Sequence, residues 1–279
     1  MASFYSRYKA ALTGKTFIIT GASSGLGQAL AIELARYGTN LILASRNENA
    51  LKSVAADCEA AGAPPPLALR TDITRLEDCR NLIARTVERY GTLDYLVLNA
   101  GVSMWARFED VTDLSIYSKL METNYLGSVN CIHSAMPHLL ESRGSIVAIS
   151  SVQGKVGIPL HTGYSASKHA LQGFLDALAT EQEAIHILVV MPTWIKGTSL
   201  RANAYGPDGK IMGSSKRAHN SDAVSVQEVS EKIIKAIVRR KSEVVIPGRL
   251  KLLMWLQLIS PAFVRKLIRN RVNLQDSAA

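Results

Sequence analysis

A tyrosine and a lysine four residues apart carry the strongest chemical signal in the chain. In GYSASKHAL, Tyr164 and Lys168 fall at positions i and i+4, so a helix over this segment places both side chains on one face. A free phenol has a pKa near ~10, and a neighbouring ammonium favours the phenolate and lowers that value. The pair is therefore predicted to exchange a proton with a substrate oxygen near neutral pH. The spacing alone leaves open a surface pair with no catalytic part.

A serine upstream of this pair strengthens the catalytic interpretation. Ser151 follows the apolar run SIVAIS at 145–150, which has the composition of a buried strand. The carboxyl ends of strands in a doubly wound sheet face the ligand crevice. We therefore expect the Ser151 hydroxyl to hydrogen-bond a substrate oxygen as charge develops on it.

A glycine-rich segment, TGASSGLG at 20–27, follows the first apolar run and opens a helix. Glycine at such a turn lets backbone N–H groups approach a pyrophosphate and lets the helix pack on the strand. A purely structural turn is the alternative, but the flanking strand and helix favour a nucleotide. The expected contacts in this loop are Gly21, Ser23, Ser24, Gly25, Leu26 and Gly27.

The end of the second strand distinguishes the two nicotinamide dinucleotides. A carboxylate there would bind the ribose hydroxyls of NAD, but this chain has Ser45 and Arg46. A guanidinium donates charge-assisted, bidentate hydrogen bonds to phosphate, so this position predicts NADP(H). A solvated surface arginine is the alternative, and Glu48 is interpreted as a first-turn helix charge.

The elements that must position these residues alternate along the chain. Six apolar runs hold Val, Ile and Leu without polar alternation, which is typical of strands covered on both faces. These runs occupy residues 16–20, 40–45, 67–70, 95–99, 145–150 and 186–191. Segments of helical length occupy residues 25–37, 48–61, 76–90, 114–140 and 164–183. The alternation predicts one α/β domain with a Rossmann-like, doubly wound parallel sheet.

The two ends of the chain and residues 196–224 depart from this alternation. Residues 196–224 are rich in Gly, Ser, Asn and charge, which predicts a long irregular functional loop, and a helix (225–240) and a strand (243–246) follow. The first fifteen residues do not resemble a signal peptide and are expected to run straight into the first strand. We expect a catalytic domain over 1–248 and a basic amphipathic extension over 249–279 that is no independent domain.

Five motifs occur together in one order: TGASSGLG, NAG at 99–101, the Asn of METNYLG, the Ser of AISS, and YSASK. With these motifs the chain resembles the short-chain dehydrogenase/reductase family over roughly residues 14–247. The resemblance implies a Rossmann-like fold and hydride exchange between C4 of nicotinamide and a substrate carbon. The remaining cofactor contacts are expected at Asp72, Ile73, Asn99, Ala100, Gly101, Pro192, Ile195 and Thr198.

The same resemblance implies a role for each catalytic residue. Tyr164 is the general acid/base, and Lys168 lowers its pKa and holds the nicotinamide ribose. Ser151 orients the substrate, since the family spacing of thirteen residues before the tyrosine selects it over Ser150. Asn124 completes a proton relay through water and Lys168. Asp72 is expected to meet the adenine, whereas Asn99 mainly braces the sheet.

One motif departs from the family pattern. The family usually has Pro-Gly and then Thr after the sixth strand, whereas this chain reads PTWIKGT at 192–198. Thr193 replaces the Gly and Thr198 falls one position late, which puts its role in doubt. Ile195 can still offer its backbone to the nicotinamide carboxamide. Trp194 is interpreted as a packing or substrate-wall residue, and His161 is expected on a solvent-facing loop rather than in the pocket.

The net charge of +9 is concentrated in an apolar C-terminal segment. Residues 249–271 hold six Lys or Arg and no acid, but the apolar run 250–259 is far shorter than the roughly 20 residues that cross a bilayer. Peripheral contact with an anionic membrane and packing over the substrate entrance or a second subunit are alternatives of equal weight. Membrane-associated relatives that act on steroids, retinoids or sphingoid ketones have similar tails, which favours a lipophilic substrate and lipid metabolism.

Other function classes fit less well. The chain has no nucleic-acid-binding module, and its three cysteines and six histidines show no metal-ligand spacing, so neither nucleic acid nor metal is expected. A catalytically silent, cofactor-binding regulatory protein is the alternative function, and the intact Asn124, Ser151, Tyr164 and Lys168 argue against it. We expect a cytoplasmic protein that forms a homo-oligomer. If the C-terminal segment contacts a membrane, the protein is peripheral on the cytoplasmic face of that membrane. In relatives the dimer or tetramer pairs through the helices bearing Asn124 and Tyr164.

Overall fold

A seven-stranded parallel sheet forms the centre of the molecule, in a computed structural model that describes residues 2–213 and 223–276. The strands lie in the order β3-β2-β1-β4-β5-β6-β9, which is doubly wound about β1 and β4. Their bounds are β1 (Thr16–Thr20), β2 (Asn40–Ser45), β3 (Leu67–Arg70), β4 (Tyr95–Leu98), β5 (Ser145–Ile149), β6 (His186–Pro192) and β9 (Glu243–Ile246). The predicted fold class is confirmed, and each predicted strand occurs within one residue of its expected bounds.

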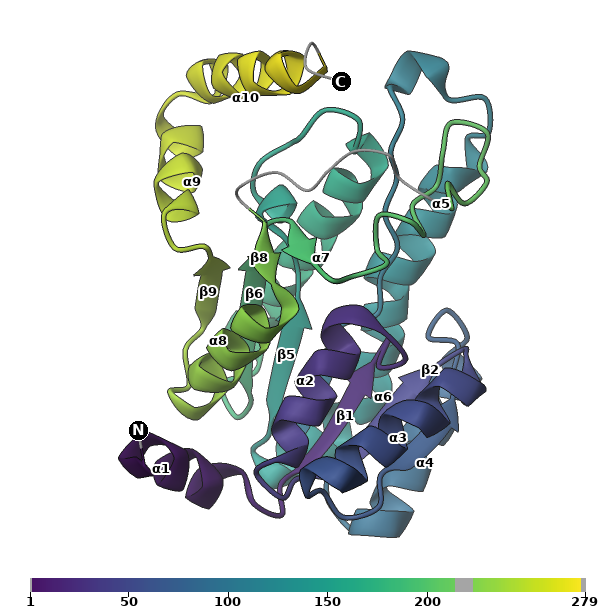
Figure 1. Cartoon of the computed structure of the whole chain (residues 1–279), viewed down its shortest axis with the longest axis vertical. Helices are drawn as coiled ribbons and strands as arrows, with labels where there is room; N and C mark the ends of the chain where they lie inside the picture. The colour runs from purple at the N-terminus through teal and green to yellow at the C-terminus, as the bar shows by residue number, and fades with distance from the viewer. Residues whose placement is uncertain (1, 214–222, 277–279) are drawn as a thin grey trace.

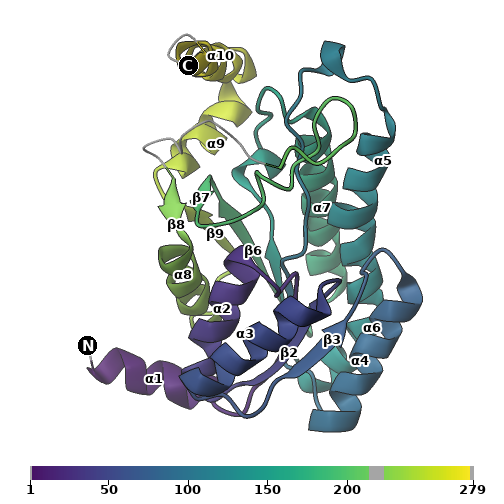
Figure 2. The same cartoon turned by 45° about the vertical axis from the view of Figure 1, so that its right-hand side comes forward.

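Helices cover both faces of this sheet, which is why its strands lack polar alternation. Successive side chains of a strand point to opposite faces, and in β1 Phe17 and Ile19 join one hydrophobic cluster while Ile18 joins the other. The first cluster includes residues of α2 (Gly25–Ala35), α3 (Glu48–Ala61) and α8 (Val226–Val238). The second includes residues of α4 (Leu76–Tyr90), α6 (Gly127–Ser142) and α7 (Thr162–Glu181). Figures 1 and 2 show these two layers on either side of the strands.

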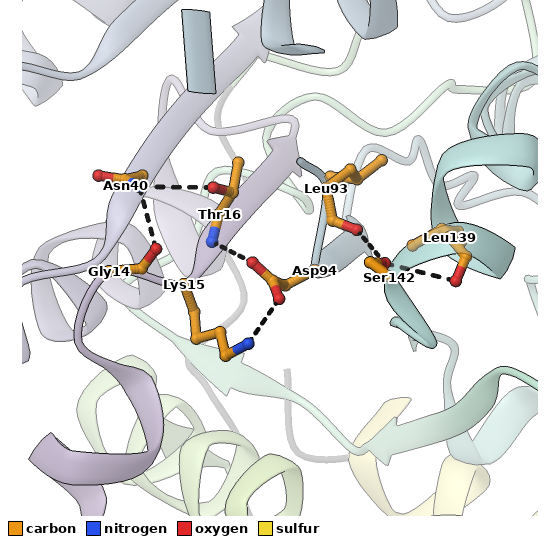
Figure 3. Close-up of polar contacts among 8 residues, drawn as sticks. All are labelled: Gly14, Lys15, Thr16, Asn40, Leu93, Asp94, Leu139 and Ser142. Atoms are coloured by element: carbon orange, nitrogen blue, oxygen red, sulfur yellow. Dashed lines mark hydrogen bonds and ion pairs between the residues drawn. The ribbon is translucent and has the colours of Figure 1, made fainter. Parts of the chain in front are cut away.

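Polar contacts join the strands at the amino end of the sheet (Figure 3). The Asp94 carboxylate, just before β4, accepts a hydrogen bond from the backbone N–H of Thr16 at 2.9 Å and pairs with the Lys15 ammonium at 2.7 Å. Asn40 donates to the Gly14 carbonyl at 3.0 Å. These contacts fix the starts of β1, β2 and β4. The loops that line the cavity lie at the opposite, carboxyl end of the sheet.

Some predicted elements were wrong in detail. The first residues do not run straight into β1, because α1 (Ala2–Leu12) precedes it and buries Leu12 in the core. The predicted helix 114–140 is divided into α5 (Ser115–Met121), a π-helical turn (Glu122–Leu126) and α6. Residues 196–213 are irregular as expected, but β7 (Ile195–Lys196) pairs with β8 (Val224–Ser225) at the edges of the loop. Residues 214–222 of that predicted loop lie outside the described residues.

The C-terminal extension forms two helices, α9 (Leu250–Ile259) and α10 (Pro261–Asp276). Leu250 and Met254 of α9 pack against the second core cluster, so the extension lies against the catalytic part of the chain. Among the helices of the described chain, none has the length and apolar character needed to cross a membrane.

Candidate active site

A cavity of about 580 Å³ lies where the strands end at their carboxyl termini. Of the predicted site residues, only Gly27 and Asn124 do not line it; both are buried directly behind it. The lining residues come from loops after β1, β2, β3, β4, β5 and β6 and from the start of α7. They are Gly21, Ser23, Ser24, Gly25, Leu26, Ser45, Arg46, Asp72, Ile73, Asn99, Ala100, Gly101, Ser151, Tyr164, Lys168, Pro192, Ile195 and Thr198.

The glycines of the first loop are required by close approach. Gly21 has a φ of +65°, and a Cβ there would lie 2.8 Å from the Cα of Ala100. A Cβ on Gly27 would collide with the carbonyl oxygen of Gly21 and the side chain of Asn99. Asn99 in turn donates from its amide to the carbonyls of Thr20 and Gly21, at 3.0 and 3.2 Å. The loop is therefore held against β4, and its N–H groups and the start of α2 face the cavity.

The second strand ends with Arg46 exposed at the cavity wall. The Ser45 hydroxyl accepts a hydrogen bond from the N–H of Asn47 at 3.2 Å, so it shapes the turn into α3. Glu48 pairs with Lys52 at 2.7 Å in the first turn of α3, consistent with its interpretation as a helix charge. Asp72 accepts from the backbone and hydroxyl of Thr74, at 3.0 and 2.8 Å, while lining the cavity.

Tyr164 and Lys168 lie buried on one face of α7 at the inner end of the cavity. Burial raises the pKa of Tyr164 to about 12, and a hydrogen bond with Ser151 acts in the opposite direction. Burial also lowers the pKa of Lys168 to about 8. The Lys168 ammonium donates to the Ile149 carbonyl at 2.9 Å and lies 5.8 Å from the centre of the Tyr164 ring. The expected lowering of the phenol pKa is therefore wrong for this structure, because burial raises the pKa by more than the Ser151 hydrogen bond lowers it.

The two adjacent serines after β5 are placed differently. Ser151 hydrogen-bonds with Tyr164, accepts from the N–H of Gln153 at 3.1 Å and donates to the Pro192 carbonyl at 3.4 Å. Ser150 also lines the cavity, but its buried hydroxyl has no hydrogen-bond partner among the described residues. The geometry thus places Ser151, rather than Ser150, against the phenol.

Asn124 lies in the π-helical turn and is fully buried. Its amide oxygen accepts from the N–H of Val102 at 2.8 Å, and its amide nitrogen donates to the Val102 carbonyl and the Ser167 hydroxyl, both at 2.9 Å. Both amide donor hydrogens thus have partners, so the side chain acts as a brace between the loop after β4 and α7. Asn124 does not line the cavity, but its amide oxygen lies beside Gly101, which does.

The segment after β6 also lines the cavity. Pro192 ends β6, and Ile195 begins the short strand β7. The Thr198 hydroxyl donates to the Ile195 carbonyl at 3.3 Å, and its side chain lies beside Gly25 of the first loop. Despite its displacement by one position, Thr198 lines the cavity.

Aromatic side chains form the far wall of the cavity. Trp105, His161 and Trp194 contact one another, with ring centres 4.8 Å apart for Trp105 and His161 and 5.4 Å for His161 and Trp194. The Arg201 guanidinium lies over the Trp105 ring at 4.5 Å, and Tyr205 also lines the wall. These five side chains and Tyr164 all line the cavity.

His161 corrects one expectation. It is only 2% exposed, not solvent-facing, because the two indoles cover it. Burial lowers its pKa to about 4, the Pro159 carbonyl at 2.8 Å opposes this, and nearby Arg201 adds to the lowering. The wall is therefore uncharged at His161 near neutral pH. Trp105, Arg201 and Tyr205 were missed by the sequence reasoning, although Trp105 follows Gly101 closely at a strand's carboxyl end, a position that could have identified it.

A doubly wound parallel sheet, a glycine turn after its first strand and a Tyr-Lys-Ser group at the carboxyl edge together define a class of oxidoreductases. The chain belongs to the short-chain dehydrogenase family, whose sequence profile matches residues 15–207.

Its relatives include two plant proteins and a bacterial structure. The chain is 32% identical over 262 residues to 11-beta-hydroxysteroid dehydrogenase A of Sesamum indicum, covering 92% of this chain and 75% of that protein. It is 37% identical over 255 residues to 11-beta-hydroxysteroid dehydrogenase A of Arachis hypogaea, covering 90% and 73%. A short-chain dehydrogenase/reductase of Burkholderia phymatum, solved in complex with NAD, has the same fold, with a TM-score of 0.76 at 22% identity over 90% of this chain and 95% of that one.

Proposed function

We propose that this oxidoreductase exchanges hydride between NADP(H) and the carbon of a ketone, aldehyde or secondary alcohol, with Tyr164 as general acid/base. One observation carries the proposal: a single cavity extends from the glycine loop and Arg46 to Tyr164 and the aromatic wall. A dinucleotide and a carbonyl substrate therefore have adjacent places within it. The names of the two plant relatives support an alcohol or ketone carbon as the reacting centre.

The proton is handled by residues of α7 and of the loop after β5. With a pKa of about 12, Tyr164 carries its proton at neutral pH and can donate it to a carbonyl oxygen that is becoming an alkoxide. Ser151 bonds the phenol and can bond the same substrate oxygen. The Lys168 ammonium, near the ring, stabilises the phenolate that remains. A protonated phenol suits reduction of a carbonyl.

The residues present fit a dinucleotide. A side chain at Gly21 or Gly27 would fill the cradle, and the start of α2 offers its N–H groups and positive dipole end to a pyrophosphate. When bound, the nicotinamide supplies or accepts the hydride. Arg46 is exposed where the cavity meets the end of β2, and a guanidinium there supports a 2′-phosphate contact and therefore NADP(H) over NAD(H).

A lipophilic substrate fits the far wall. Trp105 and Trp194 offer large apolar surfaces, and His161 is neutral near pH 7. Pockets that bind small molecules combine such apolar walls with few polar groups, here Tyr164, Ser151 and the Arg201 guanidinium that lies over the Trp105 ring. The chemistry favours a steroid, retinoid, long-chain or sphingoid ketone.

The catalytic assignment is tested by replacing Tyr164 with Phe. We expect NADPH consumption with a ketone substrate to fall by at least a thousandfold, on the order of a lost general acid, while NADPH binding stays within about twofold. Tyr90→Phe, half-buried at the end of α4 and outside the cavity lining, is the matched control and should retain full activity. A Tyr164→Phe enzyme that keeps its activity would refute the assignment.

The cofactor assignment is tested by comparing NADPH and NADH binding through nucleotide fluorescence. We expect NADPH to bind more tightly, and Arg46→Ala to reduce that preference by roughly tenfold to a hundredfold, the worth of charge-assisted hydrogen bonds to phosphate. Arg80→Ala, a surface arginine paired with Glu77 on α4, is the control. Equal affinities for the two nucleotides in the unaltered chain would overturn NADP(H).

A further inference from the structure

The C-terminal helices expose more large apolar side chains than any other segment of the described chain. Six of the thirteen large hydrophobic residues that are exposed lie between 252 and 267, so the exposure is concentrated. Leu258 and Ile259 are 76% and 79% exposed, and Trp255 is 64% exposed. We call this surface the tail face. It consists of Leu252, Trp255, Leu258, Ile259, Phe263 and Leu267.

The opposite side of the same helices is packed. Val264 and Ile268 are buried against Val156, and Leu253 and Leu256 pack into the same cluster. The helices are therefore already docked on the body of the chain by one side. The tail face is the side left over, and packing among the described residues does not explain its apolar character.

The charges beside the tail face identify its occupant. Lys251, Arg265, Lys266 and Arg269 are exposed on the same two helices, and the sequence holds no acidic residue between Glu243 and Asp276. Apolar and aromatic residues flanked by Lys and Arg are what an amphipathic helix presents to an anionic lipid surface. A second copy of a chain with net charge +9 would bring like charges together at this face, so an anionic bilayer fits better.

The packed side of the C-terminal helices lies next to the proposed substrate site. Ile158, in the loop after β5, both lines the cavity and packs against the cluster that holds Val264 and Ile268. Figures 1 and 2 show α9 and α10 at the end of the molecule toward which β5, β6 and β9 point. The C-terminal helices therefore lie between the tail face and the cavity lining at Ile158, so a surface that binds the tail face is one layer of helices away from the cavity.

From these observations we propose that α9 and α10 dock the chain on an anionic membrane and that the lipophilic substrate enters the cavity from that bilayer past Ile158. The entry route rests on the proposed function; the docking does not. Among the described residues no helix is long and apolar enough to cross the bilayer, so the proposed contact is with the membrane surface.

Flotation with vesicles tests the docking. The full chain should float with vesicles of phosphatidylserine and phosphatidylcholine and not with phosphatidylcholine alone. The triple variant Lys251→Gln/Arg265→Gln/Lys266→Gln should bind the anionic vesicles roughly a hundredfold more weakly. Each lost charge contributes a factor of about ten or slightly less. Leu258→Ser/Ile259→Ser should weaken it at least tenfold, since both residues insert. Both variants change exposed residues, so the fold is retained.

Matched variants elsewhere on the surface are the controls. Phe108 and Leu114 are 64% and 66% exposed, so Phe108→Ser/Leu114→Ser removes as much exposed apolar surface without touching the tail face. This control should float as the unaltered chain does. Brominated lipids should quench tryptophan fluorescence in the unaltered chain, and Trp255→Phe should remove most of that quenching. Equal loss in the control and tail-face variants, or failure of the full chain to float, would overturn the docking.

Two substrates separate this inference from the proposed function. The tail-face variants should reduce a water-soluble ketone as fast as the unaltered chain and should reduce a ketone dissolved in anionic vesicles at least tenfold more slowly. No NADPH consumption with any carbonyl compound, while flotation persists, would refute the proposed function and leave the docking intact. If the variants float less but reduce the vesicle-held ketone normally, the entry route is wrong. If they instead dissociate a dimer in sedimentation, the face binds a second copy and the docking is wrong.

Discussion

Replacing Lys168 with Met should stabilise the fold at neutral pH while abolishing catalysis. Burial lowers the pKa of Lys168 from its ordinary 10.5 to about 8, so below pH 8 the native chain holds a desolvated ammonium. At about 1.4 kcal/mol for each pKa unit, this costs the native state roughly 3 kcal/mol at pH 7. The cost falls as pH rises from 8 to 10.5, because the native lysine loses its proton before the unfolded one does. It is about 1 kcal/mol at about pH 9.5.

A pH-independent loss opposes this gain. Methionine cannot donate to the Ile149 carbonyl, which Lys168 bonds at 2.9 Å, and an unsatisfied buried acceptor costs about 1–3 kcal/mol. The net stabilisation by Lys168→Met at pH 7 is therefore roughly 0–2 kcal/mol. Between pH 7 and about pH 9.5, the free energy of unfolding of the unaltered chain should rise by about 2 kcal/mol relative to that of the Lys168→Met chain.

The assay is urea unfolding of both chains at the two pH values, followed by tryptophan fluorescence. Every other titrating group is common to both chains, so the shift isolates Lys168. Lys52→Met, on the exposed surface of α3, is the control, and its difference from the unaltered chain should not follow this course. A stability difference between the Lys168→Met and unaltered chains that stays constant over this range, or moves the other way, would refute a buried native ammonium.

Three further changes have defined outcomes. The pKa of His161 is about 4 in the native chain against an ordinary 6.5, so the free energy of unfolding should fall as pH drops through this interval. In urea unfolding, His161→Phe should lose up to about 3 kcal/mol less of this free energy than the unaltered chain does between pH 7 and about pH 4. An equal loss in the two chains would contradict the burial of His161. Gly27→Ala drives a methyl into the Gly21 carbonyl and should reduce nucleotide binding at least tenfold, with unchanged affinity by fluorescence titration counting against the loop geometry. Asp94→Ala leaves the N–H of Thr16 unpaired and should lower the free energy of unfolding by about 1–3 kcal/mol without changing KM, and a raised KM would mean that the contact also supports the site.

The strands and the nucleotide half of the site could be predicted because their signals are local. An unbroken run such as 186–191 specifies a buried strand wherever it pairs, and Gly21 and Gly27 are dictated by backbone contacts within one turn and the adjacent strand. The helix α1 was missed because residues 2–12 lack a strong apolar periodicity. The break at 122–126 was missed because a π-helical turn has no composition of its own.

The substrate half could not be predicted because it is assembled by contacts between distant residues. Trp105 is fixed by a hydrogen bond from its backbone N–H to the Tyr205 carbonyl at 2.9 Å, across a hundred residues of sequence. His161 is buried by indoles from two other loops. The sequence showed that an ammonium accompanies Tyr164 but not how deeply both are buried, and burial decides the direction of the pKa.

The Asp94 contacts and the cavity lie at opposite ends of the same strands. One end ties β1, β2 and β4 together through main-chain and carboxylate bonds, while the other supports the loops and the start of α7 that line the cavity. Substitutions in the loops that carry Trp105, His161 and Arg201 therefore leave the contacts at the amino end in place. Substitutions in these loops can therefore change the substrate during evolution, because each intermediate sequence keeps the contacts that hold the strands together.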